Sequence, residues 1–125
     1  MIRRALVLAV VAALALAAVA LAAPSKMKLQ PKTIYHGDVL KVSGTPGGGC
    51  EHGDTVILYS KAFPGGGEEF AGVPAVHAKV VSDGHYAKHV RIPMSKHGDY
   101  RVGGRCNGGN FAHRTLHVVT QPVGE

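Results

Sequence analysis

The chain has 125 residues, 17 of them glycine, and a formal charge of +6; 46% of its residues are hydrophobic, 18% are charged, and none is tryptophan. This length provides for one domain at most. The composition excludes a multidomain enzyme, a coiled coil, a collagen-like chain and a multi-span membrane protein.

The first 22 residues have the organisation of a secretory signal peptide. Residues 1–4 are cationic, residues 5–22 contain only Ala, Leu and Val, and Ala20-Leu21-Ala22 places small residues where signal peptidase reads them. We predict cleavage after Ala22; an uncleaved anchor is the alternative, since the 18 apolar residues are just long enough to span a bilayer. The mature domain, residues 23–125, is then expected to be secreted, without a stable membrane anchor, and to carry a charge of +4 with all eight histidines.

Cys50 and Cys106 are the only cysteines. Export places them in an oxidising environment, where pairing is the default. In the chain-entropy model, a closed loop of about 57 residues gains on the order of 4 kcal/mol from such a bond. A pair of free or metal-binding thiols is the alternative, although the spacing resembles no zinc motif.

After Pro24 the apolar residues alternate with a period of two between turn residues, which is typical of strands with one buried face. The pattern predicts an all-β, two-sheet antiparallel sandwich, with another small all-β barrel as the alternative. The seven predicted strands are 26–30, 38–43, 54–60, 74–81, 85–92, 99–106 and 112–119.

The run GDVLKVSGTPGGGC, the later DGHY and the segment GDYRVGGRC together resemble the immunoglobulin-like domain common in secreted actinobacterial proteins. The resemblance implies a seven-stranded antiparallel immunoglobulin-like sandwich over most of residues 23–125, in a bacterial extracellular protein. It differs from antibody domains, because there is no core Trp and Cys50 lies in a loop. The motifs are structural and do not identify a function. The residues that match are Gly37, Asp38, Leu40, Val42, Gly44, Asp83, Gly84, Tyr86, Gly98, Tyr100, Val102 and Cys106.

The Asp-Gly dipeptide between the fourth and fifth predicted strands indicates a hairpin. A three-residue turn at 82–84 pairs Val81 with His85 and His77 with His89. Directly opposed residues have Cβ atoms about 5 Å apart, so two imidazoles there are a candidate Zn²⁺, Cu²⁺ or Ni²⁺ site. The alternative is a solvated histidine pair.

A second outer face is predicted on the last two strands. A five-residue turn between them pairs Arg105 with His113 and Arg101 with His117, and Tyr59 lies alongside if the third strand neighbours the sixth. The result is a cationic strip with an aromatic side chain. Such a strip suits an anionic cell-wall polymer, a sugar or an acidic protein, whereas an ordinary solvated sheet face is the alternative. The modest charge and the lack of a recognition module argue against nucleic acid.

Lys88 and Arg114 fall on the core side of this alternation. We expect either that they lie at a sheet margin, where their charged ends reach water, or that a bulge shifts the register.

The motifs of common enzymes are missing from the sequence. There is no G-x-S-x-G elbow, H-E-x-x-H, P-loop or G-x-G-x-x-G, and the glycine runs precede no helix. Tyr100 fits a structural tyrosine whose hydroxyl bonds a nearby backbone group. We therefore expect a non-catalytic binding or structural module with no cofactor, whose partner is a cell-wall polymer or another exported protein. The alternatives are an exported copper- or zinc-binding protein and a small protease inhibitor that presents the loop 63–70.

Overall fold

A computed structural model describes residues 25–122, which form nine β-strands and no helix. The predicted signal peptide, residues 1–22, lies outside the described residues. No helix within 25–122 is long and apolar enough to cross a membrane. The strands are β1 Lys26–Gln30, β2 Thr33–Tyr35, β3 Val39–Thr45, β4 Thr55–Tyr59, β5 Glu69–Phe70, β6 Val73–Lys79, β7 Tyr86–Arg91, β8 Gly98–Cys106 and β9 Gly109–Val119.

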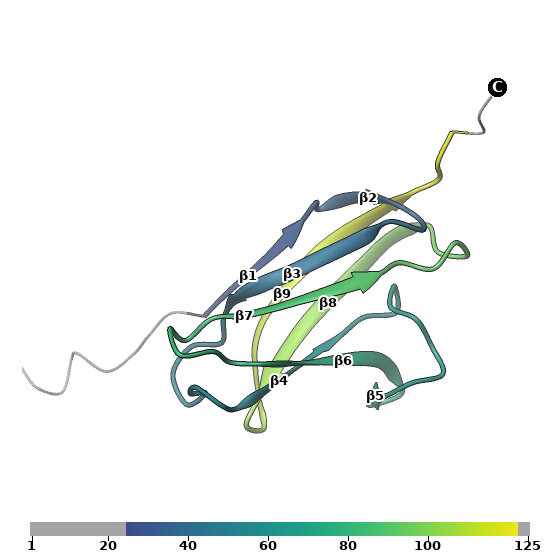
Figure 1. Ribbon diagram of the computed structural model, residues 1–125. Helices are drawn as coiled ribbons and strands as arrows, with labels where there is room; N and C mark the ends of the chain where they lie inside the picture. The colour runs from purple at the N-terminus through teal and green to yellow at the C-terminus, as the bar shows by residue number, and fades with distance from the viewer. Residues whose placement is uncertain (1–24, 123–125) are drawn as a thin grey trace, which may run out of the picture.

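The strands form two layers, one of three strands in the order β1-β3-β7 and one of six in the order β2-β9-β8-β4-β6-β5 (Figure 1). All pairings are antiparallel except that of β2 with β9. The all-β, two-sheet prediction is confirmed. The seven predicted strands are all present, and two short strands, β2 and β5, add to them.

Alternate residues of each strand form the core. Leu40 of β3 and Val56 of β4 have no exposed surface, and burying an aliphatic side chain of this size stabilises the fold by about 1.5–3 kcal/mol. Tyr86 is the largest fully buried side chain, and its hydroxyl donates to the Lys26 carbonyl at 3.2 Å. Burial raises the pKa of the Tyr86 phenol.

The predicted pairing of His77 with His89 is wrong, because β6 and β7 belong to different sheets. His77 lies opposite Ile57 of β4, and His89 lies opposite Lys41 of β3. One bond of the predicted hairpin does form, from the Val81 amide to the His85 carbonyl at 2.8 Å. The chain then crosses from one layer to the other. Even-numbered residues of both strands face the core in either arrangement, so the alternation alone does not distinguish a hairpin from a crossover.

The predicted register of the last two strands is also wrong. Arg101 pairs with Thr115 rather than His117, and Arg105 pairs with Asn110 rather than His113. The turn has only two residues, Asn107 and Gly108, with φ of 51° and 81°. Positive φ at both positions is the signature of the tight turn that Asn-Gly favours, and this turn replaces the expected five-residue connection.

Arg114 lies at a sheet margin, which was the first of the two explanations expected for its place in the alternation. Its Nε donates to the Met27 carbonyl of β1 at 3.2 Å, and its side chain is not part of the core. The irregularity in this ladder lies on β8, between Gly104 and Arg105. Lys88 is half-buried on β7, which forms one edge of the three-stranded sheet.

Tyr100 has the predicted structural role near the start of β8. Its hydroxyl donates to the His97 carbonyl at 3.0 Å and accepts from the His97 amide at 3.3 Å. These bonds close the corner through which the chain enters β8.

Candidate functional site

An aromatic pair lies on the outer face of the six-stranded sheet. Tyr59 of β4 pairs in register with Gly103 of β8, and the Tyr59 ring occupies the space that a Cβ at Gly103 would fill. The ring centroids of Tyr59 and Phe70 are 5.1 Å apart. A residue without a side chain at position 103 therefore lets the tyrosine lie flat against the sheet.

Arg105 is held over this pair at the end of β8. Its Cζ lies 5.0 Å from the centroid of the Phe70 ring, a distance typical of a cation–π contact. Its Nη2 donates to the Gly108 carbonyl at 2.7 Å, and its Nη1 to Asn110 Oδ1 at 3.3 Å. The Tyr59 hydroxyl donates to the same Asn110 oxygen at 3.3 Å. These contacts fix the orientation of the guanidinium.

Arg101 and His113 form the second part of the site. Arg101 Nη2 lies 3.4 Å from His113 Nε2, and the ring nitrogen is the acceptor because a guanidinium has only donors. Both residues line a groove of about 560 Å³ that also includes Tyr59 and Asn110. The groove therefore presents cationic, aromatic and amide groups together.

His117 does not join this group. Its Nδ1 lies 2.6 Å from Asp99 Oδ1, its register partner on β8. A carboxylate at this distance offsets the charge of a protonated imidazole, so His117 does not add to a cationic strip. Of the five predicted binding residues, the structure brings together Tyr59, Arg101, Arg105 and His113.

The predicted metal pair has no shared geometry. His77 Nε2 is 2.6 Å from Glu68 Oε2, while His89 lies on the outer face of the other sheet. The sandwich core separates the two imidazoles.

Sequence reasoning missed Phe70 and Asn110. Phe70 belongs to a two-residue strand, which is too short to show an alternation, and the expected five-residue turn includes Asn110, which lies in β9. The Asn-Gly dipeptide was the signal that predicts the tight turn and places Asn110 beside Arg105.

The loop 63–70 does not present Phe63 to a protease, because that side chain has no exposed surface. Phe70 is half-buried against Tyr59. Both aromatic side chains of this loop are thus used in packing.

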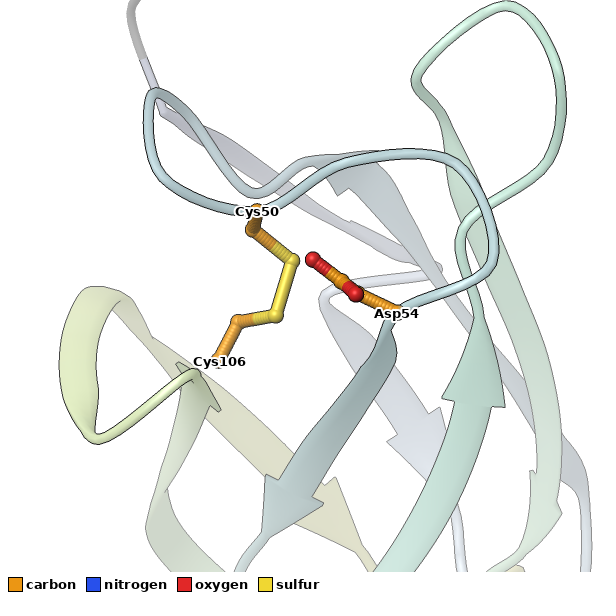
Figure 2. A group of neighbouring side chains, drawn as sticks. All are labelled: Cys50, Asp54 and Cys106. Atoms are coloured by element: carbon orange, nitrogen blue, oxygen red, sulfur yellow. A yellow bond between two sulfur atoms is a disulfide. The ribbon is translucent and has the colours of Figure 1, made fainter.

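A second group lies at the end of the sandwich where Cys50 and Cys106 form the predicted disulfide, with Cα atoms 6.0 Å apart. Figure 2 shows the Asp54 carboxylate directed toward this bond, and the candidate ligand atoms of these three residues lie within 4.8 Å of one another. The sulfurs are bonded to each other, so neither is a thiolate ligand. The bond fastens the loop before β4 to the end of β8.

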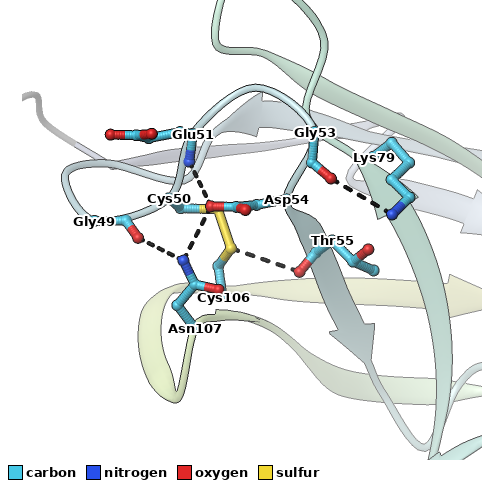
Figure 3. Close-up of a disulfide and its surroundings, with 9 residues drawn as sticks. All are labelled: Gly49, Cys50, Glu51, Gly53, Asp54, Thr55, Lys79, Cys106 and Asn107. Carbon is cyan, nitrogen blue, oxygen red and sulfur yellow. Dashed lines mark hydrogen bonds between the residues drawn. A yellow bond between two sulfur atoms is a disulfide. The ribbon is translucent and has the colours of Figure 1, made fainter.

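A hydrogen-bond network surrounds the disulfide (Figure 3). Asn107 Nδ2 donates to the Gly49 carbonyl at 2.7 Å and to Asp54 Oδ2 at 3.0 Å, and the Glu51 amide donates to Asp54 Oδ2 at 2.8 Å. The Glu51 amide and then the Asn107 side chain hold the pKa of Asp54 below its usual value. This network gives the disulfide end a structural role.

No family model matches the chain, and no curated protein matches it. Among solved structures, the chain is similar to the Pseudomonas fluorescens alkylpurine DNA glycosylase AlkC bound to DNA containing an abasic site analog. The two are 16% identical with a TM-score of 0.48, and the match covers 79% of this chain and 30% of that one.

Proposed function

We propose that this protein is an exported, non-catalytic immunoglobulin-like module that binds an anionic polymer at a bacterial cell surface. The observation that carries the proposal is the placement of Arg101 and Arg105 beside Tyr59. Neither arginine forms an ion pair within residues 25–122, where the ion pairs present all involve histidine. Uncompensated cations around an aromatic side chain favour an anionic, sugar-like ligand.

The immunoglobulin-like assignment is supported by strand order. In that fold the first, second and fifth strands share one sheet, and the third, sixth and seventh share the other. Here β1, β3 and β7 form one sheet, while β4, β8 and β9 are consecutive neighbours in the other; β6, the fourth long strand, differs from the seven-stranded pattern because it lies beside β4. The additional strands β2 and β5 lie at the two edges of the larger sheet. The disulfide differs from that of antibodies, because it joins a loop to a strand end.

Export is supported by two independent features. The first 22 residues carry the cationic start, apolar run and small-residue cleavage site of a signal peptide. A disulfide such as Cys50–Cys106 persists in oxidising compartments.

Co-sedimentation with purified bacterial cell walls tests the binding proposal. The wild-type protein should sediment with the walls, and the bound fraction should fall as salt rises, because polyanion binding releases counterions. The double variant Arg101→Ala plus Arg105→Ala should bind at least about ten-fold more weakly, since charge-assisted hydrogen bonds contribute about 1.5–3 kcal/mol each.

A charge-matched control is Lys79→Ala plus Lys96→Ala, which removes two cations that do not line this groove. This control should retain most of the binding. Equal losses in both double variants would mean that net charge alone drives sedimentation, and salt-independent binding would exclude an electrostatic mechanism.

A further inference from the structure

The cationic groove of the candidate site continues along the side of the sandwich where β1 lies beside β9. Two adjoining cavities of about 560 and 610 Å³ share Met27 and Arg114 in their walls. No Asp or Glu of the described chain lines either cavity. We call this feature the seam groove; its basic residues are Lys26, Lys28, Lys32, Arg101, His113 and Arg114.

Two side-chain bonds join the sheets directly across the seam. Arg114 Nε of β9 donates to the Met27 carbonyl of β1 at 3.2 Å, and Ser25 Oγ donates to the Phe111 carbonyl at 2.7 Å. Because these bonds connect β1, an edge strand of one sheet, and the adjoining Ser25 directly to β9 of the other sheet, no additional strand fits between β1 and β9. A ligand therefore lies over the seam rather than within it.

Arg114 is oriented for ligand binding by this arrangement. Its Nε is used in the bond to Met27, whereas no hydrogen bond or ion pair within residues 25–122 uses its Nη1 or Nη2. A guanidinium held at Nε keeps its remaining donors in a fixed plane, which suits the oxygens of an anionic group.

The lysines of the seam groove are likewise uncompensated. Lys26, Lys28 and Lys32 are exposed, and none takes part in an ion pair of the described residues. Lys26 and Lys28 alternate on β1, so their Cα atoms are about 7 Å apart along the strand. They form a row of cations parallel to β1.

We propose that the seam groove binds one linear phosphodiester polymer along β1, with Arg114 as its central contact. This proposal rests on the proposed function and adds the ligand class and the path. Three lysines with one arginine fit a run of phosphates, because the ammonium group binds phosphate as a point charge and the guanidinium binds its oxygens as a fork. Met27 and Leu29 form the floor of the groove and are almost fully buried in the core, so the cations make the contacts to the polymer.

Fluorescence polarisation with an end-labelled poly(glycerol phosphate) of about twenty repeats tests the proposal. Lys28→Ala plus Lys32→Ala should weaken binding and lower the salt dependence by about two counterions, since each phosphate contact contributes a slope of nearly one. Arg114→Ala should weaken binding about ten-fold or more, and Arg114→Lys should fall between this variant and the wild type. Thermal unfolding of each variant establishes that it is folded.

The charge-matched control is again Lys79→Ala plus Lys96→Ala, which should retain binding. Competition by glycerol phosphate monomer should be weak, because a single phosphate cannot span the row. Monomer binding as tight as the polymer, an equal loss in the control, or equal affinity for polyglutamate would each overturn the proposal. If cell-wall binding depends on Arg101 and Arg105 but not on Arg114 or the seam lysines, the proposed function stands and this inference fails.

Discussion

Removing the Cys50–Cys106 bond should strongly destabilise the domain. The perturbation is the double variant Cys50→Ala plus Cys106→Ala, which avoids leaving a free thiol. The two residues are separated by 56 positions, so the bond closes more than half of the described chain into one loop. In the chain-entropy model, a loop of this length gives on the order of 4 kcal/mol of stabilisation through the restricted unfolded state.

This magnitude is a large part of the stability of a small domain. Single domains are typically stable by about 5–15 kcal/mol, so the variant should remain folded at low temperature with a small margin. For about 100 residues, a loss of 4 kcal/mol corresponds to a fall in Tm of roughly 15–30 °C. Asn107 and Asp54 still connect the same loop and turn, so the native arrangement should persist in the variant.

Urea unfolding of the oxidised protein, the reduced protein and the double variant measures the effect. The reduced protein and the variant should agree, and both should show a larger m-value, because an uncrosslinked unfolded chain exposes more surface. If the free energy of unfolding falls by less than about 1 kcal/mol in both the reduced protein and the double variant, the loop-entropy explanation is wrong. A large loss without a change in m would place the effect in the folded state instead.

Three further predictions concern single residues. Asp54→Asn should reduce the loss of unfolding free energy at acid pH. The pKa of Asp54 is lowered on folding, so the stabilisation by its carboxylate is present above the usual value of 3.8 and is lost as the pH falls below it. Urea midpoints between pH 2 and 6 measure this, and an unchanged loss of stability at acid pH contradicts it. Tyr100→Phe should cost about 1 kcal/mol by removing the bond to the His97 carbonyl, and an unchanged Tm would show that the corner does not depend on it. Gly103→Val should displace the Tyr59 ring, which occupies the space above the glycine; near-ultraviolet circular dichroism should change, and cell-wall binding should weaken even if the protein stays folded.

Strand positions were predictable because the domain has long, regular alternation. The predicted strand at 26–30 coincides with β1, and the other six overlap β3, β4, β6, β7, β8 and β9. The short strands β2 and β5 have three and two residues, which are too few to show an alternation of apolar and polar residues. They form through pairing with β9 and β6, which is a tertiary effect.

Which sheet a strand joins could not be obtained from alternation. In a sandwich the inner faces of the two sheets pack against each other, so a strand buries the same alternate residues whether it pairs with the preceding strand or crosses to the other sheet. The segment between β6 and β7 shows this ambiguity. Its turn makes one hairpin bond, from Val81 to His85, before the strands separate.

The two wrong strand pairings had different consequences for the candidate sites, and the reason is geometric. In the β8–β9 ladder the shift is two residues at Arg101, and an even shift preserves the face. Arg101 and His113 therefore stay on the outer side and come into contact, although neither has its predicted partner. At His77 and His89 the error was in the sheet itself, so the predicted pair was lost entirely. A predicted binding surface requires only that its residues lie on the same face of the sheet, so it tolerates an error in register. A predicted chelating pair requires one particular cross-strand contact and does not.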